Sequence, residues 1–189
     1  MLNLTTATLV YLACNKTERV FPMKTGPLPT DSLILQTSPA NACCAGGRWE
    51  TLNERLSLDV VLQLDRMSCV SACGEMVSNG SLKQKDLMKV IGYPVATEYL
   101  AKALGNNWEG APVAESALDR LLQKGSWVAD VRERMGVRYA RLEFAHAVVV
   151  DGLDISGNIM IRDPAKGMRY EMTRAEFLAT WTGTAVFRK

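Results

Sequence analysis

Residues 146–164 read His146-Ala-Val-Val-Val-Asp-Gly-Leu-Asp-Ile-Ser-Gly-Asn-Ile-Met-Ile-Arg-Asp163-Pro164. Two apolar runs flank a turn over residues 152–157, which is the pattern of a β-hairpin. Pairing centred on that turn would align three cross-strand pairs: Val150 with Ile159, Val148 with Ile161, and His146 with Asp163. Directly opposed residues share a face, with Cβ atoms roughly 4.5–5.5 Å apart. The hairpin therefore predicts an imidazole beside a carboxylate, a placement that a one-residue register slip would break.

The segments on either side of this hairpin differ in their apolar period. Before it, helical spacing and end signals predict four helices: Ser68–Val77, Lys83–Val90, Pro94–Leu104 and Pro112–Lys124. The other predicted strands are Trp127–Val131, Tyr139–Phe144, Arg169–Met172 and Thr184–Phe187, with a short helix capped by Thr173 before the last of them. Helices first and an antiparallel sheet second predict an α+β fold for residues 56–189.

Residues 1–55 have a different composition from the rest. They hold four of the seven prolines and three of the five cysteines. We interpret them as an irregular N-terminal appendage, a pro-segment or linker, with one or two short strands such as 5–12. No Lys or Arg precedes the apolar start of the chain, so a classical signal peptide is not expected.

The overall composition disfavours several classes of protein. The 189 residues are 48% apolar and 22% charged, as in ordinary globular domains. The net charge is only +2, which disfavours a nucleic-acid binder. No apolar run approaches the roughly 20 residues that a membrane span needs, and five cysteines are too few for a disulfide framework. We expect no nucleic acid, no membrane and no cofactor as partners.

A candidate nucleophile lies at the predicted start of the first helix. The segment reads Gln63-Leu-Asp-Arg-Met-Ser-Cys69-Val-Ser-Ala-Cys73-Gly-Glu-Met76. A helix N-terminus favours an anion, and such a position can lower a cysteine pKa into the range of about 3.5–7.5. The chain has a single histidine, so any imidazole chemistry must use His146. The Gln63 amide and the Cys69 backbone N–H could donate hydrogen bonds to an oxyanion.

These motifs resemble those of the papain-like cysteine peptidases. Gln63 six residues before Cys69, then Cys73 and Met76, and later the His146 and Asp163 segments are similar to the bacteriocin-leader peptidases that cut after double glycine, and to bacterial papain-fold toxin domains. The resemblance covers about residues 58–189. It implies a papain-like fold, a Cys69–His146–Asp163 triad and Gln63 in the oxyanion hole, with no metal. Leader peptidases usually carry an acidic residue and a glycine around the nucleophile, where this chain has Ser68 and Val70.

The same residues are also compatible with different roles. A lone histidine on an apolar strand is often a satisfied core residue, and Cys73 is expected in the core. Asp151 or Asp154 could replace Asp163, although the first is expected on the opposite strand face and the second in the turn. A zinc site has the ligand types but not the paired spacing, with these residues as ligands: Cys43, Cys44, Cys69, Cys73 and His146.

The leading hypothesis is a cysteine endopeptidase that acts on proteins or peptides. We expect a bacterial toxin or effector with a cognate immunity protein, in the cytoplasm or delivered into a target cell by a specialised system. A leader-processing peptidase is the related possibility. Other acyl chemistry, such as deamidation, transglutamination or cell-wall amide hydrolysis, is the second hypothesis, and a silent binding module is the third. Gly46-Gly47 is a candidate self-cleavage site if the enzyme cuts after paired glycines.

Overall fold

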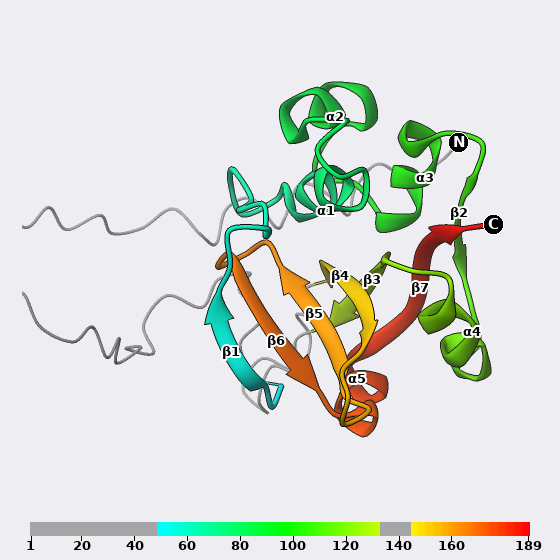
Figure 1. Cartoon of the computed structure of the whole chain (residues 1–189). Helices are drawn as coiled ribbons and strands as arrows, with labels where there is room; N and C mark the ends of the chain where they lie inside the picture. Colours follow the sequence, from blue (N-terminus) through cyan, green and yellow to red (C-terminus); the bar gives the residue numbers. More distant parts are fainter. Residues whose placement is uncertain (1–48, 133–144) are drawn as a thin grey trace, which may run out of the picture. The chain divides into compact units, whose positions relative to one another are not determined.

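The structure is a computed structural model that describes residues 49–132 and 145–189 (Figure 1). The regular elements follow in this order: β1 (Leu52–Leu56), α1 (Cys69–Val77), α2 (Gln84–Ile91), the 3-10 helix η1 (Thr97–Tyr99), α3 (Leu100–Leu104), β2 (Trp108–Pro112), the 3-10 helix η2 (Glu115–Ala117), α4 (Leu118–Gln123), β3 (Trp127–Arg132), β4 (Ala145–Leu153), β5 (Ile159–Asp163), β6 (Met168–Met172), α5 (Arg174–Thr180) and β7 (Trp181–Arg188). No helix in these two ranges is long and apolar enough to cross a membrane.

The strands form one antiparallel sheet with helices on both faces. The strand order is β1-β6-β5-β4-β3-β7-β2, and every neighbouring pair runs antiparallel. Figure 1 shows α1, α2 and α3 grouped at one side of the sheet, away from α4 and α5. The predicted α+β class is therefore confirmed.

Strand alternation divides the apolar side chains between two cores. On β4, Ala147 and Val149 pack in the core shared with α1, α2 and α3, whereas Val148 and Val150 pack in the core that holds α4 and α5. The second core contains an aromatic cluster in which Trp127 lies 6.1 Å from Phe177 between ring centroids. Full burial of one large apolar side chain stabilises the folded state by roughly 1.5–3 kcal/mol. The two cores therefore hold the sheet between its helical layers.

Helix α1 begins where the sequence predicts. Ser68 is its N-cap residue, but the Ser68 hydroxyl accepts from the Asp65 backbone N–H at 3.1 Å and not from the helix itself. The predicted apolar stripe of Val70, Cys73 and Val77 is buried. The last helix, α5, is capped as predicted, because Thr173 Oγ1 accepts from the Glu176 backbone N–H at 3.2 Å.

The register predicted for the central hairpin is wrong by two residues. Val150 pairs with Ile161, not with Ile159, and Leu153 is the residue opposite Ile159. The turn lies at residues 154–158, where the Asp154 carboxylate accepts backbone N–H groups of residues 156 and 158, and β4 carries an irregularity between residues 150 and 152. A shift of two residues preserves the face of each side chain. His146 and Asp163 therefore stay on one face as diagonal neighbours.

The two edge strands of the sheet were not located from the sequence. β1 joins one edge beside β6, and β2 joins the other edge beside β7. β2 ends at Pro112, so the predicted helix over 112–124 is reduced to η2 and α4. The predicted helix over 94–104 begins only at Thr97, as η1 followed by α3. Pro112 is tolerated because β2 is an edge strand.

Several predictions fall on residues outside the described ranges. They are the strands over 5–12 and 139–144, the Gly46-Gly47 site, and most of the appendage. Trp49 is buried, and β1 pairs with β6 at the edge of the sheet. The boundary of the appendage and its role as a pro-segment or linker remain predictions.

Candidate active site

Cys69 is the first residue of α1 and is partly buried. Burial by itself raises the pKa of the Cys69 thiol. The hydrogen bond and positive charge of His146, with backbone hydrogen bonds from Ala147 and Val70, outweigh burial and lower the pKa below its ordinary value. The geometry therefore favours a thiolate at position 69, which is the reactive form of a cysteine.

His146 lies between Cys69 and Asp163. Its Nε2 atom is 2.8 Å from Asp163 Oδ1, and both side chains are buried. Burial alone would lower the pKa of His146, but the charge and hydrogen bond of Asp163, followed by those of Cys69, raise it to about 10. The imidazole is thus held as a cation between an anionic carboxylate and an anionic sulfur, as in a nucleophile–base–acid triad.

Asp163 is itself fixed by hydrogen bonds on both oxygens. The Ala165 backbone N–H donates to Oδ1 at 2.8 Å, and the Tyr170 hydroxyl donates to Oδ2 at 3.2 Å. Burial raises the pKa of Asp163, yet His146 and these donors lower it below its usual range. The Trp49 indole N–H in turn donates to the Tyr170 hydroxyl at 3.2 Å. A hydrogen-bonded chain therefore runs from Trp49 to Cys69.

Sequence reasoning missed Tyr170 and Trp49. Trp49 comes from the segment treated as an appendage, and no local motif marks it. Tyr170 had a usable signal: Asp163 pairs with Met168 across the short turn to β6, so Tyr170 is two residues further along the same face.

We expect Tyr170→Phe to weaken both the fold and the site. The change removes the donor to a carboxylate oxygen that is buried, and an unsatisfied buried acceptor costs about 1–3 kcal/mol of unfolding free energy. Urea unfolding measures the loss, and the pH at which Cys69 becomes alkylated should rise as Asp163 holds His146 less firmly. Tyr99→Phe is the control, because Tyr99 is exposed and outside this chain of bonds. Equal effects of the two changes would contradict this role.

The backbone of Gln63 contacts the residue that follows Asp163. Its N–H donates to the Pro164 carbonyl at 2.9 Å, directly after Asp163. The side-chain Nε2 donates to the Asp65 carbonyl at 2.8 Å, and Oε1 is buried with no hydrogen-bond partner among the described atoms. The second hydrogen of Nε2 is left for another acceptor.

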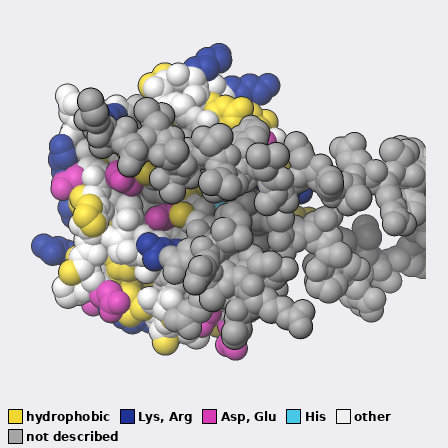
Figure 2. Space-filling view, turned by 180° about the vertical axis from the view of Figure 1, so that it is seen from behind, with side chains coloured by type: hydrophobic (Ala, Val, Ile, Leu, Met, Phe, Trp, Pro, Cys, Tyr) yellow, Lys and Arg dark blue, Asp and Glu magenta, His cyan; other side chains and the backbone are white. Residues whose placement is uncertain are grey.

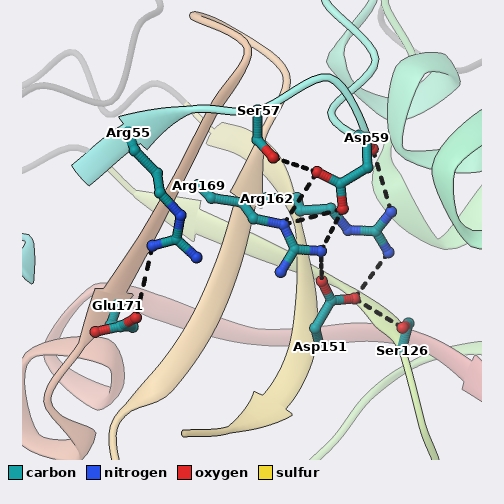
Figure 3. Close-up of polar contacts among 8 residues, drawn as sticks. All are labelled: Arg55, Ser57, Asp59, Ser126, Asp151, Arg162, Arg169 and Glu171. Atoms are coloured by element: carbon teal, nitrogen blue, oxygen red, sulfur yellow. Dashed lines mark hydrogen bonds and ion pairs between the residues drawn. The ribbon is translucent and has the colours of Figure 1, made fainter. Parts of the chain in front are cut away.

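A polar network holds the segment that leads to Gln63 (Figure 3). Arg169 binds the Asp59 carboxylate at 2.5 Å and the Asp151 carboxylate at 2.9 Å. Arg162 binds the other Asp151 oxygen at 2.7 Å, where the Ser126 hydroxyl also donates. Arg169, and then Ser57, lower the pKa of Asp59 to about 2. Asp151 is thus engaged in the network and does not take the role of Asp163.

The structure also places Asp154 and Cys73 outside the triad. Asp154 lies in the hairpin turn, and Cys73 is fully buried, with burial raising the pKa of its thiol well above the ordinary value. Cys43 and Cys44, the further ligands of the zinc hypothesis, lie outside the described ranges. Within those ranges, no group of three His, Cys, Asp or Glu residues is arranged to hold a metal ion.

A cavity of about 400 Å³ opens beside Cys69. Its lining comes from the start of α1, from the segment before α3 and from β3 and β4, and includes Cys69 and His146. On the face drawn in Figure 2, the described Lys, Arg, Asp and Glu side chains are interspersed and form no continuous basic surface. The cavity gives access from the surface to Cys69 and His146.

Comparison with known proteins finds similarity to bacterial proteins that are named as proteases or peptidases. No protein-family model matches it. A curated relative, cysteine protease effector 1 of Escherichia coli, is 36% identical over 154 residues, which are 76% of this chain and 29% of that protein. The chain therefore spans about three tenths of the length of this relative.

Comparison with solved structures finds a similar fold in a bacterial peptidase domain. The peptidase domain of Streptococcus ComA, a bifunctional ABC transporter of a quorum-sensing pathway, has a TM-score of 0.54 and 23% identity over 67% of this chain and 94% of that domain. The peptidase domain of Streptococcus mutans ComA has a TM-score of 0.48 and 22% identity, covering 69% of this chain and 98% of that domain. The chain thus resembles a cysteine protease effector in sequence and a bacterial peptidase domain in fold, in agreement with the cysteine peptidase expected from its Cys69 and His146 segments.

Proposed function

We propose that this chain is a cysteine endopeptidase domain with Cys69 as nucleophile, His146 as proton carrier and Asp163 as the group that orients it. The single observation that carries the proposal is the hydrogen-bonded series Cys69–His146–Asp163 at one wall of a cavity. The name of the Escherichia coli relative supports the same reaction class, and the likeness to the ComA domain supports the fold.

The proposed reaction follows from the charges of Cys69 and His146. The Cys69 thiolate attacks the scissile carbonyl carbon, a C–S bond forms, and the carbonyl electrons move to oxygen. The first-turn N–H of Cys69 and the Gln63 amide stabilise that oxyanion. The C–N bond then breaks as the His146 imidazolium gives its proton to the leaving amine. Neutral His146 next takes a proton from water, which attacks the thioester and releases the acid and the thiolate.

The setting of this activity is a further part of the proposal. The relative is named an effector, so we propose delivery into another cell and a cognate immunity protein that binds the chain. Cleavage after paired glycines, including cleavage at Gly46-Gly47, also stays a proposal, since those residues lie outside the described ranges.

The test compares the wild type with Cys69→Ala in a bacterial lysate, followed by N-terminal proteomics. New protein N-termini are expected with the wild type and none with Cys69→Ala. Cys73→Ala is the matched control, because it removes a thiol of the same helix that lies in the core and should retain cleavage. A mass gain of one dalton without new termini would instead indicate deamidation. Identical proteomes for wild type and Cys69→Ala would overturn the proposal.

A further inference from the structure

Two carboxylates line the same cavity as the reacting pair. Asp130 is on β3 directly opposite Ala147, the residue after His146. Glu98 is on η1, on the wall formed by residues 94–98. Neither residue takes part in the Cys69–His146–Asp163 series, so the reaction derived above leaves both carboxylates without a role.

The two carboxylates act on each other through the cavity. Burial raises the pKa of Asp130, and the negative charge of Glu98 raises it further, against the lowering effects of the Thr182 hydroxyl, Arg132 and His146. The Thr182 hydroxyl donates to Asp130 Oδ2 at 3.2 Å, which fixes one oxygen. Two like charges in a concave site repel, and a cation between them would relieve that repulsion.

The charge balance of the cavity favours a cation. Among the described lining residues, Glu98 and Asp130 are acidic and Arg66 is basic, while the His146 cation is balanced by the Cys69 anion. With both carboxyl groups ionised, the described lining residues carry one net negative charge, and Arg132, which is not among them, also acts on Asp130. A binding site for a glycine or another small neutral residue gains nothing from such a charge.

The shape and the apolar lining fit one kind of side chain. Val70, Pro94 and Val95 add apolar surface to the lining that holds Cys69 and the two carboxylates. Lysine and arginine combine an apolar stem with a charged head, so their methylenes can cover such surface while the head meets a carboxylate. A cavity of about 400 Å³ is large enough for a side chain of that length.

We propose that Glu98 and Asp130 make this cavity a specificity site for a lysine or arginine side chain close to the scissile bond of the substrate. The inference rests on the proposed peptidase activity and adds the substrate class to it. Double-glycine cleavage is compatible with it, because the basic residue lies at a position other than the paired glycines.

The first experiment profiles cleavage of a proteome-derived peptide library by mass spectrometry. The wild type should cut peptides in which Lys or Arg is enriched at one fixed position relative to the cut. From that profile, one lysine peptide and its glutamine analogue are made. Asp130→Asn and Glu98→Gln should each lower kcat/KM for the lysine peptide about tenfold or more, since each removes a charged hydrogen bond, and change it little for the glutamine peptide.

Two further variants make the result decisive. Glu115→Gln changes an exposed carboxylate outside the cavity and should leave both peptides unaffected. Glu98→Lys changes an exposed position and should reverse the order of preference toward acidic peptides. Cleavage by the wild type with no positional enrichment of Lys or Arg would overturn this inference and leave the peptidase intact. Absence of any cleavage dependent on Cys69 would overturn the proposed function instead.

Discussion

Replacing His146 with alanine should raise the pKa of the Cys69 thiol and reduce peptide cleavage by at least about 10³-fold, in keeping with the loss of a general base and acid. Of the groups that act on Cys69, burial raises the thiol pKa and His146 lowers it most strongly. Without the imidazole, burial opposes only the backbone hydrogen bonds. The thiolate then forms only near or above the ordinary thiol pKa of about 8.5.

The pH dependence of the wild type follows from the same pair. The pKa of Cys69 is lowered, so its thiolate persists as pH falls below the ordinary range. The pKa of His146 is raised to about 10, so the proton it must give to the leaving amine is present below that pH and is lost above it. Cleavage should therefore decline as pH rises through about 10, and alkylation of Cys69 should not, because the thiolate remains.

Alkylation by iodoacetamide, quantified for each cysteine between pH 5 and pH 11, measures these expectations without a known substrate. Cys69 should react at lower pH in the wild type than in His146→Ala, while Cys73 stays unreactive in both because it is fully buried. Circular dichroism melting checks that the variant is folded. Superimposable pH profiles of Cys69 in the two proteins would contradict the coupling between sulfur and imidazole.

Local patterns were sufficient to predict the elements that carry the nucleophile and the histidine. The apolar stripe of α1, the two runs of the central hairpin and the Thr173 cap are all short-range signals, and each is present in the structure. The contact of His146 with Asp163 was predicted from a wrong register. It survives because a shift of two residues returns both side chains to the same face, at a diagonal distance that long side chains can bridge.

Long-range pairing explains what could not be predicted. β1 and β2 lie at the sheet edges and are paired with β6 and β7, more than 60 residues away along the chain. Neither strand alternates clearly, so nothing local distinguishes it from a loop. The Trp49 indole and the Glu98 carboxylate likewise reach the site only because those pairings bring their segments together. Functional groups that depend on remote partners therefore need the structure.

Gly110→Ala should destabilise the domain by about 3 kcal/mol or more, at the upper end of what overpacking costs. A Cβ atom at Gly110 would lie 2.3 Å from the Glu98 carbonyl oxygen and 2.8 Å from its Cα atom. These are backbone atoms, which cannot move aside as a flexible side chain can. β2 is also held on its other side, since Gly110 pairs with the fully buried Val186 of β7.

Urea unfolding of Gly110→Ala and of Glu109→Ala separates the clash from a general weakness of β2. Glu109 is the preceding residue of the same strand and is exposed, so its replacement should change the unfolding free energy by no more than about 0.5 kcal/mol. In the fraction of Gly110→Ala that folds, relief of the clash must displace residue 98. Because Glu98 is one of the two carboxylates of the specificity site, the preference for a lysine peptide should fall as well. If Gly110→Ala were as stable as the wild type, β2 would not pack this closely on η1. The placement of Glu98 in the wall of the cavity would then be contradicted.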